Sequence, residues 1–220
     1  MIVRMSAGME ITMKQTDIIN PFQPYMTLEM DGYSQINRTD YGISHFYEFT
    51  IHDEKKHCIK AVPDASIDLL FNIGENKVST YISGTVFGVK KWELGTQDDC
   101  FGVRFQPGQG ILPKDITMEM IVNDDIEIDG DIFGKNLTEK IALAKTMSER
   151  IDIFKKAYED MVLGRNSLSD KEKINEYLVN RISRTKGMIT MRQLEDETNY
   201  SACYLRRIFK SFHGISPKQF

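Results

Sequence analysis

The first half of the chain alternates apolar and polar residues with the two-residue period of β-strands. This pattern begins near Pro24, after a lead-in of about 22 residues with little periodicity. Its clearest segment is 43–51, which is rich in aromatic and β-branched residues. Further short segments follow, separated by Gly, Pro and Asp residues: 57–62, 67–73, 77–83, 86–94 and 101–105. Short strands with turn residues between them predict a β-sandwich or β-barrel.

From Thr138 the apolar period changes to that of an α-helix. Apolar residues recur at alternating steps of three and four and form one seam: Ala144, Met147, Ile151, Phe154, Tyr158 and Met161. Thr138 is the expected N-cap and Gly164 the expected end, so we expect one long helix. The seam would serve either to pack on the β-domain or to pair two copies of the chain.

Capping signals predict three further helices. Capping boxes are formed by Ser169 with Glu172 and by Thr190 with Gln193, and Ser201 is a third N-cap. The expected apolar face of the first helix, ending at Gly187, consists of Ile174, Tyr177, Leu178 and Ile182. Asn199 suits a sharp turn between the last two helices, and Gly214 ends the last one. Two helices joined in this way predict a helix-turn-helix unit.

The last helix carries basic residues on the face that its core does not use. Its apolar stripe consists of Leu205, Ile208, Phe209 and Phe212. Cys203, Arg207 and Lys210 point the opposite way, with Arg206 beside them. An arginine on such a helix can make a bidentate contact with guanine in the major groove of DNA.

The residues of this unit resemble a known family. The pattern is Ser201-x-x-Tyr204-Leu205-Arg206-Arg207-x-Phe209-Lys210-x-x-x-Gly214-x-Ser216-Pro217-x-x-Phe220. It resembles the first helix-turn-helix of the AraC/XylS-type transcription regulators. The resemblance implies base contacts from Cys203, Arg206 and Arg207, a phosphate contact from Lys210, and an interface that includes Ala202.

The chain departs from the family pattern in two ways. Glu195 stands where the family usually has a small alanine, so it must face solvent or find a partner. The family also has a second helix-turn-helix unit, whereas this chain ends at Phe220. Fewer phosphate contacts weaken binding, so we expect this chain to bind double-stranded DNA weakly.

Two shorter motifs in the β-rich half resemble the sensor domain of one branch of these regulators. They are Pro-Asp-x-x-x-Asp-Leu at 63–69 and Gly-Val-Arg-Phe-x-Pro-Gly at 102–108. The resemblance implies a cupin-like barrel that binds a small effector or mediates dimerisation. Asp64, Asp68 and Arg104 would either line an effector pocket or hold the strands in register. A buried Arg104 needs a carboxylate, for which Asp68 is the obvious candidate.

Composition and charge fit this interpretation. The chain of 220 residues has 41% hydrophobic and 27% charged residues, and its net charge is −4. From Leu168 to Phe220 there are 10 Lys and Arg against 6 Asp and Glu, whereas the remainder has 18 against 26. A basic end on an acidic body is expected if one end faces phosphates. Cys58, Cys100 and Cys203 have no paired spacing, and no signal peptide or membrane span is recognisable, which indicates free thiols in the cytoplasm.

We therefore expect an α+β chain with three parts. These are a β-barrel or jelly-roll sensor domain (1–137), a linker and dimerisation helix (138–165) and a partial helix-turn-helix segment (166–220). The expected function is sequence-specific transcription regulation as a homodimer, controlled by a small effector or by dimerisation. The alternative is a partner-binding module that no longer binds DNA, which the end at Phe220 and Glu195 favour.

An enzyme on the barrel is the third and least favoured interpretation. Metal-binding barrels need clustered histidines, and this chain has only His45, His52, His57 and His213. Phosphate loops, nucleophile elbows and paired-cysteine motifs are not found in the sequence. We expect no cofactor and no metal.

Overall fold

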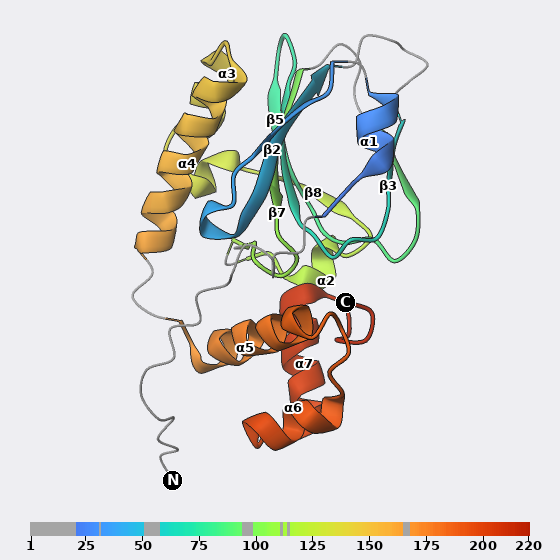
Figure 1. Cartoon of the computed structure of the whole chain (residues 1–220). Coiled ribbons are helices and arrows are strands. Elements are labelled where there is room, and N and C mark those ends of the chain that lie inside the picture. Colours follow the sequence, from blue (N-terminus) through green and yellow to red (C-terminus); the bar gives the residue numbers. More distant parts are fainter. Residues whose placement is uncertain are drawn as a thin grey trace.

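The computed structural model describes residues 21–30, 32–50, 58–93, 99–110, 112–113, 115–164 and 168–220. These residues form an α+β structure in which the strands precede most of the helices (Figure 1). Within the described ranges, six strands form one antiparallel sheet in the order β1-β2-β7-β4-β5-β8. Their bounds are Ser34–Asn37 (β1), Ile43–Thr50 (β2), Asp68–Ile73 (β4), Val78–Ser83 (β5), Asp99–Phe105 (β7) and Asp125–Ile128 (β8). A separate antiparallel pair consists of β3 (Cys58–Ala61) and β6 (Lys90–Glu93).

The alternation of residues along the strands gives the main sheet two different faces. One face carries fully buried aromatic residues, including Phe46, Phe71 and Phe101, which pack beneath two helices. These helices are α3 (Leu137–Leu143) and α4 (Met147–Leu163), which follow the short η3 (Gly130–Phe133). The opposite face is covered by α1 (Pro24–Glu29) and the β3–β6 pair (Figure 1). The remaining short elements of the β-domain are η2 (Asp40–Gly42) and α2 (Met118–Ile121).

The predicted closed barrel is not confirmed. In the part of the chain that the structure describes, β1 and β8 lie at opposite edges of an open sheet and do not pair. Helices on one face and a small sheet on the other shield the apolar surfaces that closure would otherwise bury. The β pattern expected from Pro24 is also wrong at its start, because proline at the first position opens the helix α1.

The single long helix expected over 138–165 is replaced by two helices. The break lies at 144–146, where Ala144 is extended and Thr146 caps α4 through a capping box with Glu149. Thr138 is therefore not an N-cap, although Gly164 does end α4 as predicted. Four seam residues are buried in the core under the main sheet: Met147, Ile151, Phe154 and Tyr158. Of the two uses left open for the seam, packing on the β-domain is the one that the structure shows.

The C-terminal helices form a second small core. They are α5 (Asp170–Arg184), α6 (Met191–Thr198) and α7 (Ala202–His213). The three predicted N-caps Ser169, Thr190 and Ser201 are confirmed, and Asn199 adopts the left-handed conformation at the turn. The core beneath them contains Leu178, Val179, Ile182, Leu194, Leu205 and Phe209. We call residues 168–220 the reader.

The reader contacts the β-domain through the C-terminal end of α7, close to α2 (Figure 1). Gly214 has a left-handed φ of 69° as the C-cap of α7 and lies against Val122, so closely that a Cβ atom would fall 2.0 Å from Val122 Cγ2. Gly108 follows β7 and lies against His213, where a Cβ atom on the glycine would fall 2.1 Å from His213 Cε1. These two contacts leave the N-terminal half of α7 directed away from the β-domain.

Candidate functional site

The first candidate site is the exposed face of α7. Cys203, Arg206, Arg207 and Lys210 are all exposed there, and Ala202 is half-buried at the first helical position. Arg207 lies over the ring of Tyr204, with its guanidinium carbon 5.3 Å from the ring centroid. None of the three cations forms an ion pair with another described residue. The helix therefore presents uncompensated positive charge to solvent.

Two of the three acidic residues of α6 have hydrogen-bond partners inside the reader. Glu197 accepts hydrogen bonds from Arg181 Nε at 2.8 Å and from the Tyr177 hydroxyl at 2.7 Å. Arg181 also holds the pKa of Glu197 below its usual value. This contact ties α5 to α6.

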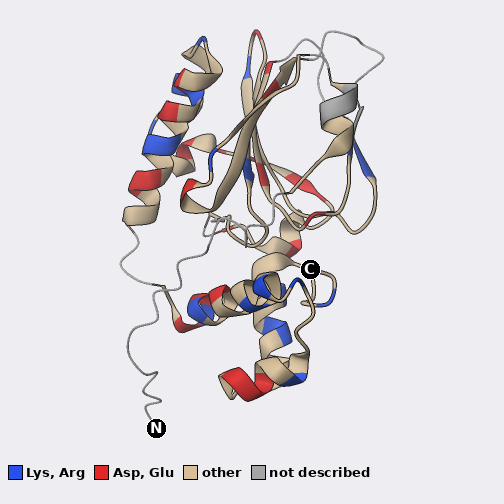
Figure 2. Cartoon of the chain, viewed as in Figure 1, with Lys and Arg blue, Asp and Glu red and all other residues tan. Residues whose placement is uncertain are grey.

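Glu195 also has a partner. Its Oε1 accepts a hydrogen bond from the backbone N–H of Ala202 at 2.5 Å. That N–H is one of the four at the start of α7 that lack a partner within the helix, and a carboxylate there also complements the helix dipole. Glu195 thus has the partner that the sequence analysis required, and it links α6 to the start of α7. In Figure 2 the ribbon is blue at the Lys and Arg positions along α5 and α7.

The second candidate site lies on the face of the main sheet beneath α1. Strand register places a row of residues across five strands: His45, Arg104, Asp68, Ser83 and Asp125. Arg104 is 3% exposed and donates from one terminal nitrogen to Asp68 Oδ2 at 2.6 Å and from the other to Asp64. The predicted pair of Arg104 with Asp68 is confirmed, and Asp64 joins it.

The loop between β3 and β4 brings Asp64 to Arg104. Asp64 Oδ1 accepts the N–H of Ser66 at 3.2 Å, a turn that Ala65 completes with a left-handed φ of 59°. Gln23, just before α1, donates to Asp64 Oδ2 at 2.9 Å and exchanges two further hydrogen bonds with the backbone of Val62. The arrangement joins three segments that are far apart in the sequence.

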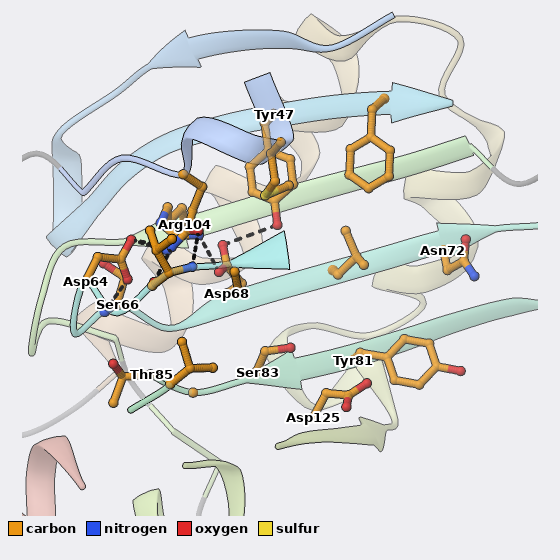
Figure 3. Close-up of a pocket in the computed structure, with 18 residues that line it drawn as sticks. Tyr47, Asp64, Ser66, Asp68, Asn72, Tyr81, Ser83, Thr85, Arg104 and Asp125 are labelled. Atoms are coloured by element: carbon orange, nitrogen blue, oxygen red, sulfur yellow. Dashed lines mark hydrogen bonds and ion pairs between the residues drawn. The ribbon is translucent and has the colours of Figure 1, made fainter. Parts of the chain in front are cut away.

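Gly102 makes room for a tyrosine in the same site. Tyr47 is the cross-strand neighbour of Gly102, and its ring lies over the glycine, where a Cβ atom would fall 2.0 Å from the ring. From that position the Tyr47 hydroxyl donates to Asp68 Oδ1 at 3.2 Å, as Figure 3 shows. A residue with any side chain at 102 would prevent this contact.

Burial shifts the acidity of the groups in the row. It raises the pKa of Asp68 to about 6, against the opposing effect of Arg104. It lowers the pKa of His45 to about 4, and the positive charge of Arg104 adds to that effect. At neutral pH the row therefore contains a neutral histidine, a charged arginine and a carboxylate that burial makes unusually basic.

A cavity of about 160 Å³ lies over this row. Its lining includes Asp64, Asp68 and Arg104, together with aromatic residues from β2 and β5 (Figure 3). Of the two interpretations left open for these charged residues, the one in which they hold strands together is confirmed. They also line the cavity, and the binding of an effector there stays a prediction. Sequence reasoning missed Gly102, Gln23 and Tyr47, because their roles depend on cross-strand packing.

A second buried histidine, His213, lies at the junction of the two domains. Its Nε2 bonds to Asn175 Oδ1 at 2.7 Å, and burial lowers the pKa of His213 to about 3.

The histidine pair His52 and His57 lies outside the described residues. Among the residues that are described, no three His, Cys, Asp or Glu side chains are placed to hold a metal ion. In the same residues, no helix has both the length and the apolar character needed to span a bilayer.

Fold and sites together define a class: an α+β protein with a cavity in its β-domain and a C-terminal helix-turn-helix pair whose second helix is basic. Residues 41–127 match the model of a family described as a domain of unknown function (DUF6597). The match runs from just before β2 almost to the end of β8, and so includes the Arg104 row, but it covers less than half of the chain. No curated protein and no solved structure matches the chain significantly.

Proposed function

We propose that this protein is a sequence-specific transcription regulator of the AraC/XylS type, in which the α6–α7 pair reads double-stranded DNA. The observation that carries the proposal is the exposed face of α7, where Arg206, Arg207 and Lys210 form no ion pair with another described residue. A second helix that begins away from the body of the protein and carries exposed arginines suits entry into a major groove.

Each residue of this face has a distinct role in the proposal. Arg206 and Arg207 contact base edges, since arginine forks match the acceptors of guanine. Cys203 and Ala202 lie one turn nearer the start of α7 and approach the bases or sugars there. Lys210 neutralises a phosphate, which contributes affinity but no sequence preference.

The β-domain acts as the sensor in this proposal. A cavity with buried polar groups supports effector binding, and the contact of α7 with the β-domain provides a route to the reader. The cupin-like assignment, homodimerisation and a cytoplasmic location complete the proposal. Dimerisation uses a surface other than the α4 seam, because the seam is buried within the chain.

The alternative of a partner-binding module without DNA binding loses one of its two supports. Glu195 is bonded to the start of α7, so it is compatible with an intact helix-turn-helix geometry. A single experiment separates the two functions. Preferred duplexes are first selected from a random library with the whole chain, and affinity is then measured by fluorescence anisotropy over a series of salt concentrations.

The proposal predicts different effects for the three cations. Arg206→Ala and Arg207→Ala each weaken binding to the selected duplex by about 1–3 kcal/mol and relax the preference at one base pair. Lys210→Ala weakens binding to all duplexes equally and reduces the salt slope by about one. Arg38→Ala is the matched control, since this exposed arginine belongs to the β-domain. Equal affinities of the wild type and the Arg206 and Arg207 variants would refute the proposal.

A further inference from the structure

The cavity above the Arg104 row has a distinctive composition. Three carboxylates line it, from Asp64, Asp68 and Asp125, against the single guanidinium of Arg104. Both terminal nitrogens of Arg104 are already bonded, one to each of the first two carboxylates. One guanidinium balances one carboxylate, so the cavity retains an excess of negative charge.

Aromatic side chains form much of the remaining wall. Tyr47 and Phe49 stack on one another with ring centroids 6.2 Å apart, and Tyr81 lines the cavity from β5. The faces of aromatic rings attract cations and also pack well against apolar groups. A ligand with a positive end and an apolar body would meet both kinds of wall.

Buried polar atoms without a partner provide an independent indication of a ligand. Ser66 is 2% exposed and lines the cavity, and its hydroxyl has no hydrogen-bond partner among the described residues. Arg104 Nε also lacks one, but it can donate only to an acceptor, which an ammonium group does not offer. Since buried polar groups are nearly always bonded, a ligand donor is expected at the Ser66 hydroxyl, which can accept from an ammonium group.

We propose that the cavity binds a small primary ammonium compound with an apolar body, and that this compound is the effector of the regulator. The effector role rests on the proposed function, whereas the binding site stands on the geometry alone. An anionic ligand bonded to Arg104 Nε would lie beside Asp64 and Asp68, and like charges at that distance repel. The high pKa of Asp68 supports the proposal, because a nearby cation would relieve the cost of its buried charge.

The size of the cavity limits the ligand. Cavities of about 150 Å³ admit a benzene-sized molecule, and this one measures about 160 Å³. Three probes of nearly equal shape therefore test the charge preference: benzylammonium, benzyl alcohol and benzoate. Isothermal titration calorimetry on the whole chain, without DNA, measures the binding of each.

We expect benzylammonium to bind roughly ten-fold more tightly than benzyl alcohol, as for one hydrogen bond to a charged group. Benzoate should show no binding. Asp68→Asn should make the affinities for benzylammonium and benzyl alcohol nearly equal, and Ser66→Ala should weaken the binding of benzylammonium. Asp125→Asn tests the charge excess without disturbing Arg104, since Asp125 lies at the exposed end of the row. Its circular dichroism melt should match that of the wild type, while its preference for the ammonium probe falls.

Tightest binding of benzoate, equal binding of all three probes or binding of none would overturn the proposed site. The effector role has a separate readout, which is anisotropy of the selected DNA duplex with and without saturating benzylammonium. A bound ammonium that leaves DNA affinity unchanged overturns the effector role alone. Calorimetric binding in a protein that binds no DNA overturns the proposed function and leaves the ammonium site standing.

Discussion

Substitution of Gly102 by alanine tests how the cavity site is built. The added Cβ atom would lie 2.0 to 2.5 Å from three carbons of the Tyr47 ring. These distances are far below van der Waals contact, and both residues belong to central strands of the main sheet. The Tyr47 ring must therefore leave its position over β7, and its hydroxyl loses Asp68.

Two effects set the size of the expected loss. Overpacking of a filled core costs about 1–3 kcal/mol. A hydrogen bond to a charged group contributes about 1.5–3 kcal/mol, and the 3.2 Å length of this one favours the lower end. Both follow from the same displacement of the ring, so we expect Gly102→Ala to lower the free energy of unfolding by about 3 kcal/mol.

Urea denaturation followed by near-ultraviolet circular dichroism measures this loss. Gly88→Ala is the control, because a Cβ atom at Gly88 meets no atom within 4 Å, and its effect should stay below about 1 kcal/mol. Combining Gly102→Ala with Tyr47→Ala should cost less than the sum of the two single substitutions. A Gly102→Ala protein as stable as the Gly88→Ala protein, or additive effects in the double variant, would show that the ring does not depend on the glycine.

Three further predictions concern other parts of the molecule. Glu195→Ala should lower stability of the reader by about 1 kcal/mol through loss of the bond to the start of α7, measured by thermal melts against Glu195→Gln, which should lose less. Stability should fall as pH drops from about 6.5 to 4, because unfolding then frees His45 and His213, whose native pKa values are about 4 and 3, to take up protons. In this range each histidine lowers the free energy of unfolding by about 1.4 kcal/mol for each unit of pH. Below pH 6 the folded state also gains a proton at Asp68, which cancels the effect of one histidine. A urea midpoint that does not change between pH 7 and 5 contradicts this reasoning. Gly108→Ala should loosen the contact of α7 with the β-domain, raising hydrogen exchange near His213, whereas Gly187→Ala, with similar φ but open space, should not.

Local chemistry allowed much of the reader to be predicted from the sequence. Capping boxes and the left-handed Asn199 act within a few residues, so Thr190 with Gln193 and Ser201 were recognisable without tertiary contacts. The ion pair of Arg104 with Asp68 followed from the alternation of its strand and the cost of burying a lone charge.

Other features depend on contacts that the sequence does not display. The strands β1 and β8 are short edge strands whose residues are half exposed, so their apolar periodicity is weak. The break before α4 did have a local signal, since Thr146 and Glu149 form a capping box, but the continuous seam concealed it. The cavity and the close approach of Tyr47 to Gly102 arise from register across strands.

The strand β7 carries Arg104, and only three residues separate that side chain from Gly108, which lies against His213. At about 3.3 Å per residue, the two points are at most roughly 13 Å apart along the chain. Because Gly108 offers no side chain that could flex, we expect a movement of the strand to displace the imidazole of His213. A change in the contents of the cavity should consequently act on the last turn of α7. The first turn of the helix, at the far end, should then be displaced by rotation about that last turn.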